Sequence, residues 1–268
     1  MTDQTLNPEV EEEQMGILQH LDVLRIHITR ALIGLMIGAG ISFTFATWLF
    51  KEAVDCTNLS TLFVTAEDIA KSCPEIQFIR PTENIEVYFQ IVLLSGLILT
   101  MPWVLYQLWA FISPGLLPKE KRLVYIFVPI ATLLFLLGVA FAWFVLIPPA
   151  LNFLNNFLAT ETTKVEWTAD SYFDFMTGFL FWLGTAFQLP LIFYFIGRFG
   201  LLGPELLKEG WRFAVVGIAI LSAIITPSID PVTMLLTMAP LTLLYVISIW
   251  TSGLGYRQFM RNDNNDSG

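Results

Sequence analysis

Charged and metal-binding side chains are scarce in this 268-residue chain. Asp, Glu, Lys and Arg together fill 14% of the positions, against roughly 25% in soluble domains. Two cysteines and two histidines are too few for a metal cluster, so we predict no metal site and no cofactor. The net charge of -9 offers none of the clustered Lys and Arg that nucleic acid requires, which excludes nucleic acid as a partner. The first 16 residues have no basic segment, so we expect no cleavable signal peptide.

Apolar residues, by contrast, fill 55% of the chain and give a mean hydropathy of +0.66. A helix needs about 20 apolar residues, at about 1.5 Å each, to cross a hydrocarbon core of roughly 30 Å. The sequence therefore predicts an all-α, polytopic membrane protein with six spans, the last two short. The predicted spans are Ile28–Phe50, Val87–Ile112, Leu123–Leu151, Phe173–Ile196, Phe213–Ile225 and Val232–Trp250. At its length, the fifth could instead be a buried core helix or a re-entrant segment.

The distribution of Lys and Arg favours a fifth span that crosses. With six spans and the N-terminus inside, ten basic residues lie on the inner side and four on the outer side. The inner residues are Arg25, Arg30, Lys119, Lys121, Arg122, Arg198, Lys208, Arg212, Arg257 and Arg261, and the outer ones are Lys51, Lys71, Arg80 and Lys164. Without the fifth crossing, Arg257 and Arg261 move outside and the ratio falls to eight against six. The positive-inside rule thus predicts six spans with both termini in the cytoplasm.

The chain reads as one domain. We predict an acidic tail over 1–16, a membrane bundle over 17–255 and a disordered polar tail over 256–268. The sequence has no internal repeat, which counts against transporters built from inverted repeats.

Ionisable residues are absent from the middle of every predicted span, although such residues commonly mark function in membranes. Several acids lie near the outer boundary, namely Glu83, Glu86, Asp170, Asp174 and Asp230. His20 and His27 lie at the inner surface, away from any candidate nucleophile, so we predict no enzyme. A small-solute transporter or channel is the competing class, but it needs a continuous polar path and charged midplane residues. The sequence favours a binding scaffold.

Gln188 is a polar exception inside the fourth span, just before Pro190. An unpaired amide in hydrocarbon costs several kcal/mol, so Gln188 must find a partner. It could pair within the bundle, including with carbonyls freed by Pro190, or it could dock another transmembrane helix. Further prolines lie in or beside the spans, at Pro102, Pro129, Pro148, Pro149 and Pro240. Because prolines kink helices, we predict a concave bundle suited to partner helices.

Both cysteines fall in the first predicted outer loop, at Cys56 and Cys73. In an oxidising compartment we predict a structural disulfide between them, with two free thiols as the alternative. By lowering the chain entropy of the unfolded state, a disulfide that closes a loop of about this length should stabilise the folded state by roughly 3 kcal/mol.

The most informative stretch is YQLWAFISPGLLPKEKR, at Tyr106–Arg122. It resembles the first cytoplasmic loop of the receptor family of the twin-arginine protein translocase. Four further segments agree with that family in order and spacing. They are HLDVLR at His20–Arg25, the second-span proline Pro102, FQLP at Phe187–Pro190 and TPSIDP at Thr226–Pro231. Each motif alone is weak, but the ordered set is specific.

This resemblance implies a receptor for folded proteins that carry an N-terminal twin-arginine signal, in an energised bacterial plasma membrane or thylakoid. The family's loop acid falls on Glu120, whose carboxylate suits the planar fork of an arginine. Phe111 would line the adjacent surface, and Arg25 would orient the acids. One departure is Val23, which stands where the family usually has an acid. Asp22 precedes it and is the candidate to join Glu120.

The resemblance also implies partners. Single-span translocase subunits of the TatA and TatB type would dock near Gln188 and Pro190, where Gln188 replaces the glutamate of many relatives. Membrane lipid and self-association complete the expected partners. Pro102 and Asp230 are expected to be structural.

Overall fold

The computed structural model describes residues 8–54, 75–112, 121–157, 166–226 and 230–266. Nearly all of this part is helical, which confirms the all-α prediction. Its helices are α1 Pro8–Val54, α3 Glu83–Ile112, α4 Lys121–Phe141, α5 Ile147–Asn156, α6 Ala169–Ala186, α7 Leu189–Arg198, α8 Pro204–Glu209, α9 Trp211–Ile225 and α10 Pro231–Asp266. Two three-residue strands, β1 Glu75–Gln77 and β2 Glu166–Thr168, pair in parallel, and the sequence did not predict them. Cys56 and Cys73 lie outside the described residues, so their disulfide stays a prediction.

Five helical segments are long and apolar enough to cross a membrane, and α9 adds a shorter apolar helix of 15 residues. The six predicted apolar helices are therefore present, and the fifth is short as predicted. The prediction that the sixth is short is wrong, because α10 runs for 36 residues. Its span, Pro231–Arg261, continues beyond Trp250 through small residues that pack closely on α7. Helix also extends past both predicted limits of the bundle, 17 and 255.

Proline interrupts two of the spans, as expected. The third changes to a π-helix at Ala142–Leu146 and resumes as α5, where Pro148 and Pro149 follow. The fourth breaks between α6 and α7, immediately before Pro190. In contrast, three helices continue through a proline: α3 through Pro102, α4 through Pro129 and α10 through Pro240.

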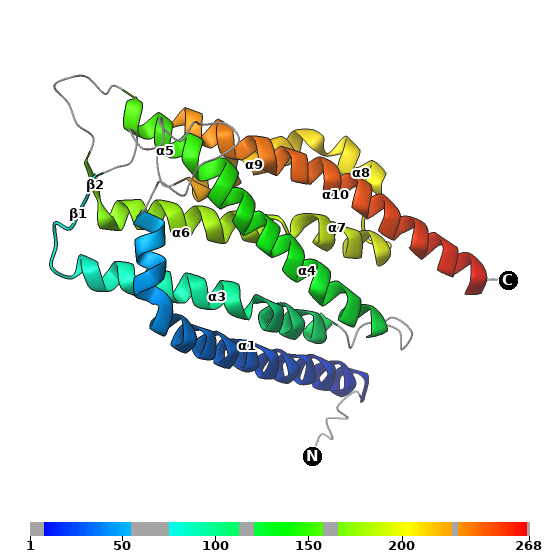
Figure 1. Cartoon of the computed structure of the whole chain (residues 1–268). Coiled ribbons are helices and arrows are strands. Elements are labelled where there is room, and N and C mark those ends of the chain that lie inside the picture. The colour runs from blue at the N-terminus through cyan, green and yellow to red at the C-terminus, as the bar shows by residue number, and fades with distance from the viewer. Residues whose placement is uncertain (1–7, 55–74, 113–120, 158–165, 227–229, 267–268) are drawn as a thin grey trace, which may run out of the picture.

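The helices form a wall, with α1 at one edge, packed mainly on α3. Next come α6 and α7, then α10 and α9, while α4 crosses the bundle obliquely (Figure 1). Both chain termini lie at one end, and the β1–β2 pair lies at the other (Figure 1). An even number of crossings requires this arrangement.

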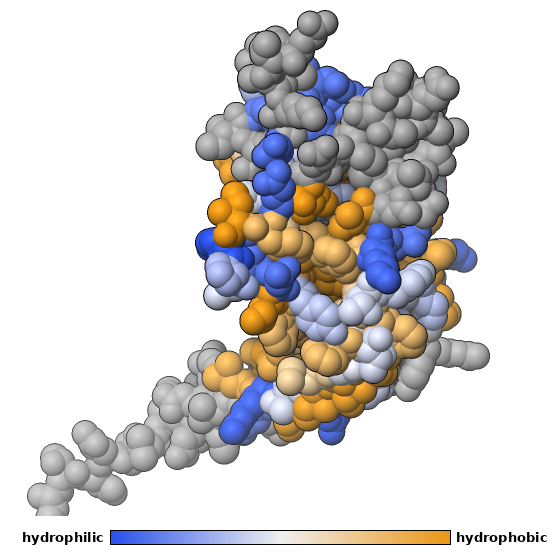
Figure 2. Space-filling view, turned by 60° about the vertical axis from the view of Figure 1, so that its left-hand side comes forward, coloured by the Kyte–Doolittle hydropathy of each residue, from blue (hydrophilic) through white to orange (hydrophobic). Residues whose placement is uncertain are grey.

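Helix α6 is the centre of the core. Tyr172, Phe173, Phe175 and Phe179 of this helix are each at most 2% exposed. Phe50 at the end of α1 stacks on Phe173, with ring centroids 5.3 Å apart. Figure 2, turned so that the strand-bearing end comes forward, shows hydrophilic side chains among hydrophobic ones. Many large apolar side chains elsewhere remain exposed, as a membrane-embedded surface requires.

Glycines allow the closest helix contacts. A Cβ added at Gly96 of α3 would lie 2.7 Å from the backbone nitrogen of Ala39 in α1. One added at Gly255 of α10 would lie 2.2 Å from the carbonyl oxygen of Tyr194 in α7. Small residues at crossings are the usual means of packing helices in membranes, where apolar side chains gain little from leaving lipid.

Candidate functional site

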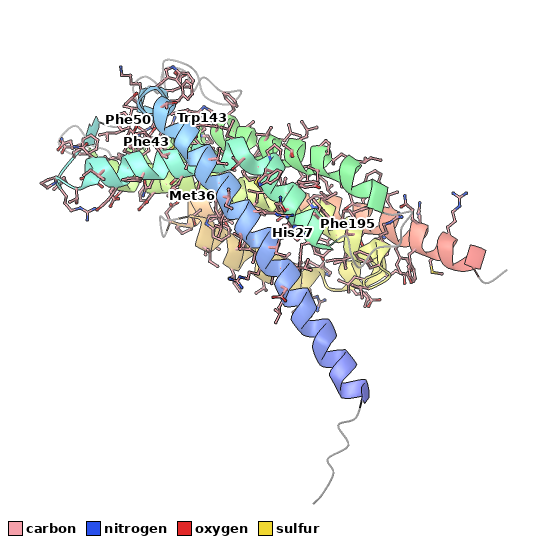
Figure 3. All side chains as sticks on the ribbon, turned by 90° about the horizontal axis from the view of Figure 1, so that it is seen from below. His27, Met36, Phe43, Phe50, Trp143 and Phe195 are labelled. Carbon is pink, nitrogen blue, oxygen red and sulfur yellow. The ribbon has the colours of Figure 1, made fainter. Side chains whose placement is uncertain are left out.

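Helix α1, just after the N-terminal motif, meets the end of α3 at the end of the bundle that carries both termini. His27 Nδ1 lies 2.8 Å from Gln107 Oε1, and the His27 ring meets Phe111 edge-on at 6.5 Å. Figure 3 shows α1 crossing α3, with His27 near the C-terminal part of α3. Because Gln107 is buried and Phe111 half-buried, this contact fixes the register of α1 against α3. The structure thus places the part of α1 that directly follows the HLDVLR segment against the start of the loop motif.

The side chains predicted to bind a signal are only partly described. Asp22 and Arg25 are exposed on α1, on the two turns before His27. No ion pair joins Asp22 and Arg25 within the described residues, so the orienting role of Arg25 stays a prediction. Glu120 lies outside the described residues. Since α3 ends at Ile112 beside His27, the loop that carries Glu120 starts next to the α1 motif.

Gln188 has the partner that its burial demands. It is 8% exposed, and its Nε2 donates to the carbonyl oxygen of Ala131 in α4 at 2.9 Å. The neighbouring Pro190 is tied to α10, because its carbonyl accepts the Thr251 hydroxyl at 2.7 Å. This geometry is the one expected for pairing within the bundle, and docking of another transmembrane helix at Gln188 stays a prediction.

A different groove holds a polar pair that sequence reasoning missed. It lies between α3 and α6, encloses about 630 Å³, and ends against Ile224 and Ile225 of α9. Within it Gln90 Nε2 donates to Asp174 Oδ1 at 2.6 Å. The Gln90 Oε1 atom is buried and has no hydrogen-bond partner among the described residues, while Asp174 is exposed. In the sequence, these two residues appear only as a polar residue near the start of the second predicted span and another near the start of the fourth.

The strand-bearing end is organised by a buried carboxylate. Glu83 is 1% exposed, and it accepts backbone N–H groups from Ile79 at 2.8 Å, Arg80 at 3.1 Å and Asp170 at 2.9 Å. The Arg80 guanidinium in turn lies 2.8 Å from Asp170 and 3.5 Å from Glu86. These contacts join the start of α3 to the start of α6. Proximity to the outer boundary was all that the sequence indicated for these acids.

Asp230 caps α10, since its Oδ1 accepts the backbone N–H of Thr233 at 2.7 Å. Capping oxygens of this kind satisfy donors that the first turn leaves free. Pro102 is exposed on α3. Among the described residues, no group of three His, Cys, Asp or Glu side chains is arranged to hold a metal ion.

The ordered motifs, the six helices and the meeting of α1 with the end of α3 agree with one family model. That model, described as Sec-independent protein translocase protein (TatC), matches residues 19–240. The chain belongs to the TatC family.

Individual relatives within the TatC family cover most of the chain. The protein from Aquifex aeolicus is 34% identical over 250 residues, which are 91% of this chain and 97% of the relative. The chloroplastic protein of Pisum sativum is 33% identical over 250 residues, 92% of this chain and 66% of the relative. A crystal structure described as the twin arginine translocase receptor TatC superposes with a TM-score of 0.75 at 33% identity, and covers 88% of this chain. The fold is therefore that of the TatC family, and the chain is an integral membrane protein.

Proposed function

We propose that this chain is the signal-peptide receptor and core subunit of a twin-arginine translocase, which exports folded proteins across an energised membrane. Family membership along residues 19–240 carries the proposal. The role is binding rather than catalysis, and it requires no cofactor. The contact of His27 with Gln107 supports it, because His27 follows the N-terminal motif by two residues and Gln107 belongs to the loop motif, so the two motifs lie at one end of the bundle.

Signal recognition, in this proposal, occurs where α1 meets the loop after α3. The Glu120 carboxylate accepts one arginine of the signal bidentately, and Asp22 supplies a second negative charge. Phe111 lines the adjacent surface, already packed against His27. The exposure of Asp22 and Arg25 leaves both side chains accessible to a peptide.

The orientation in the membrane follows from charge. Both termini lie at one end of the bundle, and we place that end in the cytoplasm because the basic residues favour it. The bacterial plasma membrane is the expected location, with the thylakoid as the alternative. The Glu83 cluster and the β1–β2 pair then face the opposite compartment.

Single-span subunits of the translocase, and further copies of this chain, are the proposed membrane partners. The sequence places a docking point at Gln188 and Pro190, but docking there requires Gln188 to leave the Ala131 carbonyl or to use its oxygen. The groove with Gln90 and Asp174 offers an exposed carboxylate beside an amide oxygen that has no hydrogen-bond partner among the described residues. A partner helix with a hydrogen-bond donor in its outer half fits that groove, and such bonds contribute about 0.6–2 kcal/mol in membranes.

Complementation of export tests the function. A strain that lacks its own receptor should regain export of a folded reporter when it expresses this chain, and only when the signal of the reporter contains the arginine pair. The matched reporter with a twin-lysine signal is the control. Rescue of both reporters, or of neither despite normal membrane insertion, would contradict the proposed function.

A further inference from the structure

A shallow groove lies between α1 and α3. It encloses about 390 Å³ and lies in the same half of the bundle as His27. Its lining consists of Arg30, Ile33, Gly34, Ile37, Thr100 and Trp103. The apolar members are open to the surroundings, since Ile33 is 54%, Ile37 59% and Trp103 45% exposed.

Arg30 places a positive charge at one end of the groove. It is exposed and is the third residue of the apolar run that begins at Ile28. Within the part of the chain that the structure describes, no acidic side chain forms an ion pair with Arg30. Asp22, eight residues earlier on α1, lies about 12 Å away along the helix. A guanidinium at the edge of the hydrocarbon is well placed to pair with an anionic group at the membrane surface.

Trp103 shapes the rest of the groove. Its indole Nε1 donates to the backbone carbonyl of Arg30 at 3.0 Å, which fixes the ring beside the charged end. The ring packs directly on the backbone of Gly34, where an added Cβ would lie 2.2 Å from Trp103 Cδ1. The groove is therefore open and apolar, with the Trp103 ring on one side and the Arg30 guanidinium at one end.

We propose that this groove binds one anionic phospholipid, with its phosphate on Arg30 and an acyl chain along Ile33, Ile37 and Trp103. Basic pockets between membrane helices recognise such lipids by this combination of charge and apolar surface. In the proposed orientation the groove faces the cytoplasmic leaflet, where anionic lipids concentrate. The positive charge of Arg30 disfavours an arginine-bearing signal as the occupant, so the site does not rest on the proposed signal binding.

Quenching of tryptophan fluorescence tests the site in the full-length chain. The protein is placed in phosphatidylcholine nanodiscs that contain a small fraction of either phosphatidylglycerol or phosphatidylcholine, each with brominated acyl chains. Brominated phosphatidylglycerol should quench more than brominated phosphatidylcholine at the same fraction. Arg30→Gln should weaken this preference about fivefold, which corresponds to the contribution of one basic residue near anionic lipid. Arg30→Lys should keep part of it.

Two further variants separate this site from general attraction. Arg257→Gln removes another exposed arginine, on α10, and should leave the preference intact. Trp103→Phe removes the proposed reporter and should abolish the excess quenching. Equal quenching by the two lipids, an unchanged preference in Arg30→Gln, an equal loss in Arg257→Gln, or excess quenching that survives Trp103→Phe would each overturn the proposal.

Discussion

Backbone groups satisfy two of the polar side chains buried in this bundle, Gln188 and Glu83. The Gln188 amide donates to the carbonyl of Ala131, and the Glu83 carboxylate accepts three backbone N–H groups. A buried polar group without a partner costs more free energy than its hydrogen bond contributes. The sequence therefore shows that such a residue needs a partner. It does not show which one, because backbone atoms carry no sequence signal.

Glu83→Gln should destabilise the outer end of the bundle. The amide keeps the size of the side chain, but its NH₂ group would face backbone donors that the carboxylate now accepts. We expect the midpoint of thermal unfolding in detergent to fall by about 5 °C.

Glu86→Gln is the matched control. The side chain of Glu86 is 47% exposed, and its carboxylate forms a surface ion pair with the Arg80 guanidinium at 3.5 Å. Its midpoint should change by less than about 1 °C, as expected for a surface ion pair. Equal shifts of the unfolding midpoint in the two variants would show that the buried hydrogen bonds of Glu83 stabilise the protein no more than the surface ion pair of Glu86 does.

Gln188→Leu separates the two roles considered for this residue. Loss of the bond to Ala131 should lower the free energy of unfolding by about 1 kcal/mol, typical of hydrogen bonds between membrane helices. If a partner subunit also docks there, its association should loosen without loss of signal binding. Photo-crosslinking from position 188 in the assembled complex distinguishes the structural role from the docking role. Crosslinks to a partner subunit would support docking, and crosslinks confined to the chain itself would show that Gln188 is purely structural.

Close contact between α1 and α3 depends on small residues rather than on large apolar ones. Gly96 is buried against the backbone of Ala39, and Gly38 lies opposite Thr100. Since α1 packs mainly on α3, this crossing and the His27–Gln107 contact set the position of the whole N-terminal helix. An account of signal binding at α1 therefore depends on the crossing.

Gly96→Ala should push α1 away from α3. The new Cβ would stand 2.7 Å from a backbone nitrogen, which no side-chain movement relieves. We expect a loss of about 1–3 kcal/mol in the free energy of unfolding, as for other overpacked sites. Gly40→Ala is the control, because nothing lies within 4 Å of its added Cβ. It should be neutral or slightly stabilising in a helix. A Gly40→Ala variant as unstable as Gly96→Ala would contradict this explanation.

Helices were the most predictable part of the fold. Apolar run length located all six, and proline located the breaks before Pro190 and beside Pro148. The length of α10 was missed, because Gly255 looks like a helix end until its close contact with Tyr194 is known. The β1–β2 pair was missed because three residues leave no periodic pattern. Gln90 and Asp174 were missed for a related reason, since their pairing exists only across helices.

The two termini share one end of the molecule, and the Glu83 cluster occupies the other. The positive-inside rule predicts that the termini lie in the cytoplasm. Single cysteines at positions 68, 164 and 229, in a variant without native cysteines, should react with a membrane-impermeant maleimide from outside. A cysteine at Arg257 should react only after the membrane is opened. Labelling of position 229 only from inside would show that α9 does not cross.

Recognition of the arginine pair is the central claim, and binding of a signal peptide to the purified full-length chain tests it most directly. Peptides with twin-arginine and twin-lysine sequences are compared on the natural chain and on Glu120→Gln. We expect the natural chain to prefer the twin-arginine peptide. The Glu120→Gln variant should bind it about tenfold or more weakly, because a charge-assisted pair contributes roughly 1.5–3 kcal/mol. Its thermal stability should be unchanged. A Glu120→Gln variant that binds the twin-arginine peptide as tightly as the natural chain would contradict the account.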